Sequence, residues 1–217
     1  MDDPAGRFRD LTLDEFSKRL SSDAPAPGGG AASAIAASLG AALVAMVAAL
    51  SVDRPKYAAW AEHIARYGDA ARDLASGLLD MADDDARVYA AFSRALKLPR
   101  ETDEEKATRT AAIRAAARDA AGIPLRILEA CREVVAASEA LAGRSNLNAA
   151  SDLAVASRLA EAAAHGAAEN VLVNLPAIAD ATVADELTGR VAELLAAVEE
   201  LAETTRAHVE RGELREP

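Results

Sequence analysis

The sequence predicts an all-α bundle of about six to eight helices, one of them very long, in a single domain over residues 1–217. No stretch alternates apolar and polar residues with the period of a strand, whereas apolar residues recur every three or four positions in most segments. Hydrophobic residues make up 51% of the chain but aromatic residues only 3%, so the core must consist mainly of Ala, Leu and Val. Because each alanine buries little area, we expect closely packed helices and a homodimer that covers what remains exposed.

The first helix is short and is followed by a segment that cannot be helical. Thr12 and Glu15 have the spacing of a capping box, which predicts a helix that ends near Leu20. Two prolines and three consecutive glycines then fall within residues 24–30. Such a segment breaks helices and predicts a loop that leads into the next element.

An uncharged apolar helix is predicted over residues 31–51. Residues 31–50 contain no charge and are long enough in principle to span a bilayer. Ten of these twenty residues are alanine, two are serine, and no second such segment exists, which favours a buried central helix over a membrane span. We therefore expect no membrane partner.

The next segment predicts the very long helix. No proline occurs from residue 56 to 98, and the apolar residues keep a helical period throughout. A helix of this length exceeds the width of a small domain, so we expect either a kink near Gly77 or a protruding end.

The second half of the chain predicts further helices separated by short breaks. A second capping box at residues 102–105 starts a helix that runs to about 121, where Gly122 and Pro124 should interrupt or kink it. Three further helices are predicted. The first follows this interruption and ends near residue 141, the second covers residues 152–173, and the third runs from about residue 180 to 211.

Charge and cysteine content exclude several classes of function. The formal net charge is -11 and no run of Lys or Arg interrupts the acidic background, so nucleic acid is excluded as a partner. Cys131 is the only cysteine, which excludes an internal disulfide and predicts a reducing compartment, the cytoplasm. The three histidines have no metal-binding spacing, and we expect no metal.

Asp85 is the strongest candidate for chemistry because it lies on the apolar side of its own helix. The neighbours that share its face are Leu78, Met81, Ala82, Val88, Tyr89 and Phe92. Asp84 should pair outward with Arg87, and Asp83 should reach the same arginine. A carboxyl group held away from water, with two adjacent acids, should have a raised pKa, which suits a general acid/base. The alternative is that Asp85 caps a neighbouring helix or pairs with a buried arginine.

Two other groups of polar or small residues are candidates for binding. The apolar helix is preceded by Gly28, Gly29 and Gly30, which allow the backbone to come close to a ligand or another helix. The free N–H groups at the start of that helix attract anions, and Ser33 lies one turn further on. The Lys and Ser/Thr of a P-loop are missing, which disfavours a nucleotide. The second group is Asn146, Asn148, Ser151, Asp152, Asn170, Asn174 and Asp180. Their side chains either satisfy helix ends or bind a ligand.

Four segments resemble the formiminotetrahydrofolate cyclodeaminase/methenyltetrahydrofolate cyclohydrolase family. They read LTLDEF, PAPGGGAASAIAASLGAALVAMVAAL, DDDARVYAAFSRALKLPRETDEEK and SNLNAASDLAVASRLAEAAAHGAAENVLVNLPAIAD, and they cover most of the chain in the family's order. The resemblance implies an all-helical homodimer that acts on a one-carbon tetrahydrofolate without a further cofactor. The chain departs from the family pattern at Ser145 and near Asp53, where glycine is usual.

The resemblance also implies roles for particular residues. The family's catalytic aspartate corresponds to Asp85. The residues implied to bind the substrate are Gly28, Gly29, Gly30, Ser33, Asn146, Asn148, Asp152, Asn170 and Asn174. The implied reaction is the cyclisation of 5-formiminotetrahydrofolate to 5,10-methenyltetrahydrofolate with release of ammonia. The alternatives are a methenyltetrahydrofolate cyclohydrolase and a helical scaffold without catalytic activity.

Overall fold

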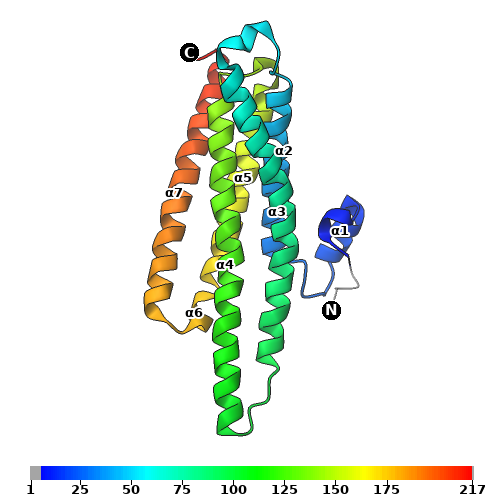
Figure 1. Cartoon of the computed structure of the whole chain (residues 1–217), viewed down its shortest axis with the longest axis vertical. Helices are drawn as coiled ribbons and strands as arrows, with labels where there is room; N and C mark the ends of the chain where they lie inside the picture. Colours follow the sequence, from blue (N-terminus) through cyan, green and yellow to red (C-terminus); the bar gives the residue numbers. More distant parts are fainter. Residues whose placement is uncertain (1–5, 217) are drawn as a thin grey trace.

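The described part of the chain is helical throughout its regular structure. A computed structural model describes residues 6–216 and contains no strand among them. The α-helices are α1 (Leu13–Leu20), α2 (Gly29–Ala49), α3 (Ala61–Leu96), α4 (Asp103–Leu141), α5 (Ala150–Leu172), α6 (Leu175–Ile178) and α7 (Ala181–Arg211) (Figure 1). Short 3-10 turns cover Phe8–Asp10, Pro55–Trp60 and Leu147–Ala149. The predicted all-α class is confirmed, as is the presence of a very long helix.

Helices α2, α3, α4 and α5 form an up-and-down four-helix bundle. In chain order each packs against the next, and α5 packs back against α2, which closes the ring. Helix α7 lies along α4 and α5 and covers the groove between them (Figure 1). Within the described chain, no long helix covers the equivalent outer groove between α2 and α5.

Small residues bring the neighbours of α2 unusually close, as the composition predicted. A Cβ atom added at Gly40 would lie 3.0 Å from the carbonyl oxygen of Ala156 on α5. One added at Gly68 on α3 would lie 2.7 Å from the Cβ of Ala48. Both distances are at or below the lower limit for such contacts, so a larger residue at either glycine would push α2 away from its neighbour.

Helix α3 is longer than the other helices of the bundle except α4, and one end of it protrudes from the bundle. It runs without interruption through Gly77 for 36 residues. Its C-terminal end and the start of α4 extend together beyond the other helices (Figure 1). Of the two expected solutions, a kink or a protruding end, the chain uses the second.

Of the two predicted effects of Gly122 and Pro124, the interruption is wrong, because α4 continues through both residues. Pro124 has no backbone N–H, so the carbonyl oxygen of Ala120 loses its usual helical partner. The side-chain amide of Asn174, which lies between α5 and α6, donates to this oxygen at 3.2 Å. It also donates to the carbonyl oxygen of Asn170 at 2.7 Å. A distant side chain thus replaces the missing donor, which sequence periodicity cannot reveal.

We expect Asn174→Ala to lower the free energy of unfolding by about 1–3 kcal/mol, since it leaves the Ala120 carbonyl without a partner. Pro124→Ala restores a backbone N–H to that carbonyl, so Asn174→Ala should cost less in the Pro124→Ala background. Urea denaturation of the four proteins of this double-mutant cycle measures the difference. An equal cost in both backgrounds would show that Asn174 does not compensate for Pro124.

The turn after α2 explains the second departure from the family pattern. Asp53 has a φ of 60°, in the left-handed region that glycine adopts most easily. Aspartate is among the residues that tolerate this conformation better than most. Aspartate at position 53 is therefore compatible with the turn that follows α2.

Candidate active site

Asp85 lies against the first turn of α2. A Cβ atom added at Gly30 would lie 2.2 Å from Oδ1 and 2.6 Å from Oδ2 of Asp85. The backbone N–H of Ala31 donates a hydrogen bond to the same carboxylate. Only glycine at position 30 leaves room for a carboxylate this close to the helix start.

The surroundings of Asp85 raise its pKa. Burial of the carboxyl group is the main cause, and the hydrogen bond from the Ala31 N–H opposes it. A carboxyl group whose pKa is raised is better suited to accept a proton and return it as a general acid/base. The structure confirms the expected direction of the pKa shift. The carboxyl group also lies against the first turn of α2, which is compatible with the alternative that Asp85 caps a neighbouring helix.

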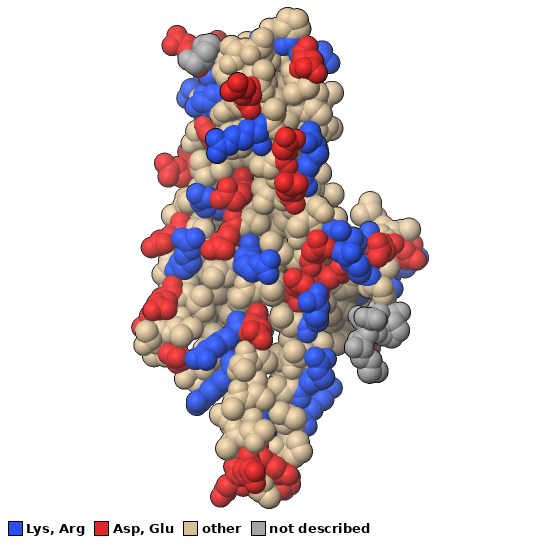
Figure 2. Space-filling model, viewed as in Figure 1, with Lys and Arg blue, Asp and Glu red and all other residues tan. Residues whose placement is uncertain are grey.

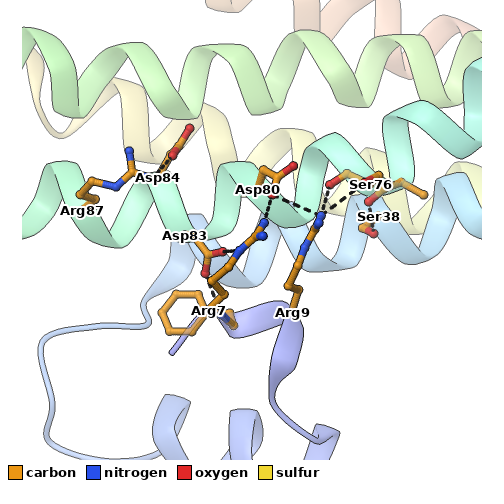
Figure 3. Close-up of polar contacts among 10 residues, drawn as sticks. Arg7, Arg9, Ser38, Ser76, Asp80, Asp83, Asp84 and Arg87 are labelled. Carbon is orange, nitrogen blue, oxygen red and sulfur yellow. Dashed lines mark hydrogen bonds and ion pairs between the residues drawn. The ribbon is translucent and has the colours of Figure 1, made fainter. Parts of the chain in front are cut away.

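The two acids next to Asp85 point elsewhere (Figure 3). Asp84 pairs with Arg87, as predicted. The predicted contact of Asp83 with Arg87 is wrong, because Asp83 pairs with Arg7 at 3.3 Å and accepts the backbone N–H of Phe8 at 2.7 Å. Both acids are therefore paired with cations, and burial rather than their charge raises the pKa of the third.

The segment before α1 forms an arm on α3 that sequence analysis missed. Arg7 also pairs with Asp80, and Arg9 donates to the carbonyl oxygen of Ser76 at 2.6 Å (Figure 3). Figure 2 shows the resulting cluster of acidic and basic side chains where the arm meets the bundle. A contact across more than sixty residues leaves no local pattern in the sequence.

Helix α5 contributes a second wall beside the start of α2. The Ser33 Oγ would lie 2.4 Å from a Cβ added at Gly166. The side-chain nitrogen of Asn170 would lie 3.4 Å from one added at Gly29, and it donates to the carbonyl oxygen of Gly166 at 2.7 Å. Since its NH2 group is used by the backbone, the side-chain oxygen of Asn170 is left to accept a hydrogen bond from a ligand.

The structure therefore brings together most of the residues predicted to form the site. These are Gly28, Gly29, Gly30, Ser33, Asp85, Asn170 and Asn174. They combine a carboxyl group of raised pKa, a helix start that attracts negative partial charge, and amide and hydroxyl groups. We call this group the Asp85 cluster.

The other predicted residues lie at the opposite end of α2. The backbone N–H of Asn146 donates to Ser51 Oγ at 2.8 Å, and its side-chain oxygen accepts the N–H of Asn148 at 3.1 Å. Asp152 follows in the first turn of α5. We call Asn146, Asn148 and Asp152 the Asp152 cluster. The 21 residues of α2 span ~31 Å, so the two clusters do not meet within one chain.

The Asp85 cluster mixes buried and exposed residues: Gly30 and Ser33 are buried, Asp85 is half-buried and Gly29 is exposed. Two surface hollows, of about 470 and 620 Å³, lie elsewhere, and Asp85 lines neither of them. Over the described residues, no three His, Cys, Asp or Glu side chains lie close enough to hold a metal ion.

Comparison with known proteins places this arrangement in context. The sequence profile of formiminotransferase-cyclodeaminase matches residues 12–193. The chain is 39% identical to methenyltetrahydrofolate cyclohydrolase of Methylorubrum extorquens, over 91% of this chain and 97% of that protein. It is 32% identical to formimidoyltransferase-cyclodeaminase of Rattus norvegicus, over 88% of this chain but only 36% of that protein. A crystal structure of formiminotetrahydrofolate cyclodeaminase from Thermotoga maritima matches with a TM-score of 0.85 and 26% identity, covering 94% of this chain and 98% of that chain.

Proposed function

Because the chain belongs to the formiminotransferase-cyclodeaminase family, we propose that it is an enzyme that cyclises 5-formiminotetrahydrofolate to 5,10-methenyltetrahydrofolate and releases ammonia. The observation that carries this proposal is the carboxyl group of Asp85, partly buried against the start of α2 with a raised pKa. Family membership supplies the substrate class, and the site supplies the acid/base that the reaction requires.

The reaction needs one proton to move between two nitrogens. N10 of the folate attacks the carbon of the formimino group on N5, whose imino nitrogen is protonated. A C–N10 bond forms, and N10 loses its proton to Asp85. Asp85 then returns that proton to the former imino nitrogen, the bond from carbon to this nitrogen breaks, and ammonia leaves. The carboxylate ends as it began, next to the methenyl cation that it stabilises.

A methenyltetrahydrofolate cyclohydrolase is the second candidate, favoured by the end-to-end match to the Methylorubrum extorquens protein. Here Asp85 takes a proton from water while the hydroxyl adds to the methenyl carbon. The C–N5 bond then breaks, N5 takes the proton of the added hydroxyl, and 10-formyltetrahydrofolate is released with one net proton. The same carboxylate serves both reactions because they share the methenyl cation.

We further propose that the enzyme works as a cytoplasmic homodimer with no cofactor other than its folate substrate. The net charge of -11 supports the absence of a nucleic-acid partner. The single cysteine supports a reducing compartment, and burial raises the pKa of its thiol to about 12, so Cys131 is unreactive. The buried side of α2 supports a soluble protein over a membrane protein.

Absorbance of the methenyl group tests the two reactions directly. Purified enzyme should form 5,10-methenyltetrahydrofolate from 5-formiminotetrahydrofolate and release one ammonia per turnover. Loss of methenyl absorbance without any activity on the formimino compound would instead identify the cyclohydrolase. Absence of both activities, with no reduced folate raising the melting temperature, would reject the enzyme in favour of a scaffold.

A further inference from the structure

The face of α3 that carries Asp85 continues past this residue as an apolar ledge. At intervals of three to four residues it carries Tyr89, Phe92 and Leu96, which therefore project from the same side of the helix. Ala82, which precedes Asp85 on this side, is fully buried. Tyr89 and Leu96 are instead 46% and 45% exposed. We call Tyr89, Phe92 and Leu96 the Tyr89 ledge.

The ledge begins where two neighbouring helices end. Gly30, in the first turn of α2, meets Asp85, and Asn170, in the last turn of α5, meets Gly29. Both helices thus end at the level of the carboxylate, whereas α3 continues for eleven residues to Leu96, which is roughly 16 Å (Figure 1). The ledge therefore extends from the carboxylate along the protruding part of α3.

Tyr89 is distinctive because aromatic residues are rare in this protein. They make up 3% of the chain, and in the part that the structure describes Tyr89 is the one exposed aromatic side chain. It follows Asp85 by four residues, so the two side chains are neighbours on the helix surface. An aromatic face in this position suits a flat ligand ring, which stacks on it.

Resting on the proposed function, we infer that Tyr89 is a substrate-binding residue whose ring stacks on the pterin of the folate while N5 and N10 lie at Asp85. The pterin contains N5, so it must lie next to the carboxylate that exchanges a proton with N10. Its pyrimidine half is flat and aromatic, and it needs a surface of the same kind.

The other groups around the carboxylate do not provide such a surface. The start of α2 presents the backbone of Gly29 and Gly30, and Asn170 presents an amide. These groups suit the polar edge of the pterin, which carries hydrogen-bond donors and acceptors. Tyr89 supplies the missing apolar face, so edge and face are recognised by different elements of the fold.

Affinity for a stable reduced folate tests this assignment. Calorimetric titration with 5-formyltetrahydrofolate should show a Kd about tenfold higher for Tyr89→Ala than for the wild type, the usual size of a lost stacking contact with a nucleic-acid base. Tyr89→Phe keeps the flat ring and should bind within about threefold of the wild type. Tyr89→Leu keeps apolar area without the ring and should lose nearly as much as alanine.

The matched control is Val155→Ala on α5, because Val155 is 47% exposed and lies outside the ledge. This variant should bind the folate as the wild type does. Equal affinity of Tyr89→Ala and the wild type would overturn the inference, and so would wild-type affinity of Tyr89→Leu.

Fragments of the folate identify the ring that stacks. The inhibition constant of 6-methyltetrahydropterin should rise by the same factor in Tyr89→Ala as the Kd of the whole folate. The inhibition constant of p-aminobenzoylglutamate should not change. A loss confined to p-aminobenzoylglutamate would overturn the assignment of the pterin.

Kinetics separate binding from a structural role. Stacking holds the pterin equally in the ground state and the transition state, so Tyr89→Ala should raise KM about tenfold and change kcat by less than about threefold. Because Tyr89 is exposed, the melting temperature should stay within a few degrees of the wild type. A changed mass in sedimentation with unchanged folate affinity would make the ledge a protein contact and overturn the proposal.

The wild-type protein distinguishes the two possible failures. If it neither binds nor turns over a reduced folate, the proposed function fails and the role of Tyr89 fails with it. If it does both and Tyr89→Ala does so equally well, the proposed function stands and only the stacking contact is rejected.

Discussion

Asp85→Asn is expected to lower turnover of the folate substrate by about 10²–10⁴-fold, the usual contribution of a general acid/base. Asparagine has the shape of aspartate and can still accept the Ala31 N–H, so the fold should be retained. The rate of methenyl formation, measured by absorbance at saturating substrate, checks this result. The matched control is Asp84→Asn on the adjacent residue, which pairs with Arg87 and should stay near wild-type activity. Equal activity of both variants would remove Asp85 from the mechanism.

The same variant should change the pH dependence of stability. Because burial raises the pKa of Asp85 in the folded state, the folded protein binds the proton more tightly than the unfolded chain. This contribution to stability is present below the unfolded pKa and is lost as the pH rises through the folded pKa. The Asp85→Asn variant has no carboxyl group at this position, so it does not lose this stability as the pH rises. The melting temperature of the variant minus that of the wild type should therefore be larger at pH 8 than at pH 4. An opposite trend would mean that the ionised carboxylate is the favoured form in the fold.

Gly30→Ala should be nearly as damaging to activity, at about 10²-fold or more, although it adds only one methyl group. The new Cβ would overlap both oxygens of Asp85, so the carboxylate must move off the start of α2 and lose its contact with Ala31. A displacement of about 1 Å at a reacting group is enough for a loss of this size. Steady-state kinetics should show the effect in kcat, because the displaced group acts on the reacting atoms.

The matched control is Gly77→Ala on α3, where an added Cβ meets nothing within 4 Å. Alanine also favours a helix over glycine by about 1 kcal/mol, so this variant should be as active as the wild type and slightly more stable. If Gly30→Ala kept full activity, the contact between Asp85 and the start of α2 would have no role in catalysis.

Most of the helices could be predicted from the sequence because their signals are local. The capping boxes at Thr12 and Thr102 form as predicted, each with its glutamate partner. Asp180 caps α7 through the N–H of Val183, at the predicted start of that helix. The continuity of α4 could not be predicted, since it depends on Asn174 from a distant part of the chain.

The position of Asp85 against the start of α2 is consistent with the sequence pattern, whereas the grouping of the candidate residues could not be predicted from it. Helical periodicity selected Asp85 because the apolar face of α3 is a local property of the sequence. Which cluster each asparagine joins depends on the antiparallel order of α2 and α5, and that order is a property of the whole fold. The partner of Asp83 was missed for the same reason, because the arm that carries Arg7 returns from 76 residues away.

The bond from Asn174 to the carbonyl of Ala120 has a consequence for motion. It requires α4 and the end of α5 to keep one longitudinal register, because sliding either helix by a turn would separate donor from acceptor. The same amide group also holds the carbonyl of Asn170, which borders the start of α2. The residue that replaces the donor missing at Pro124 is thereby also bonded to Asn170, so the register of α4 and the position of Asn170 beside the start of α2 depend on the same amide group.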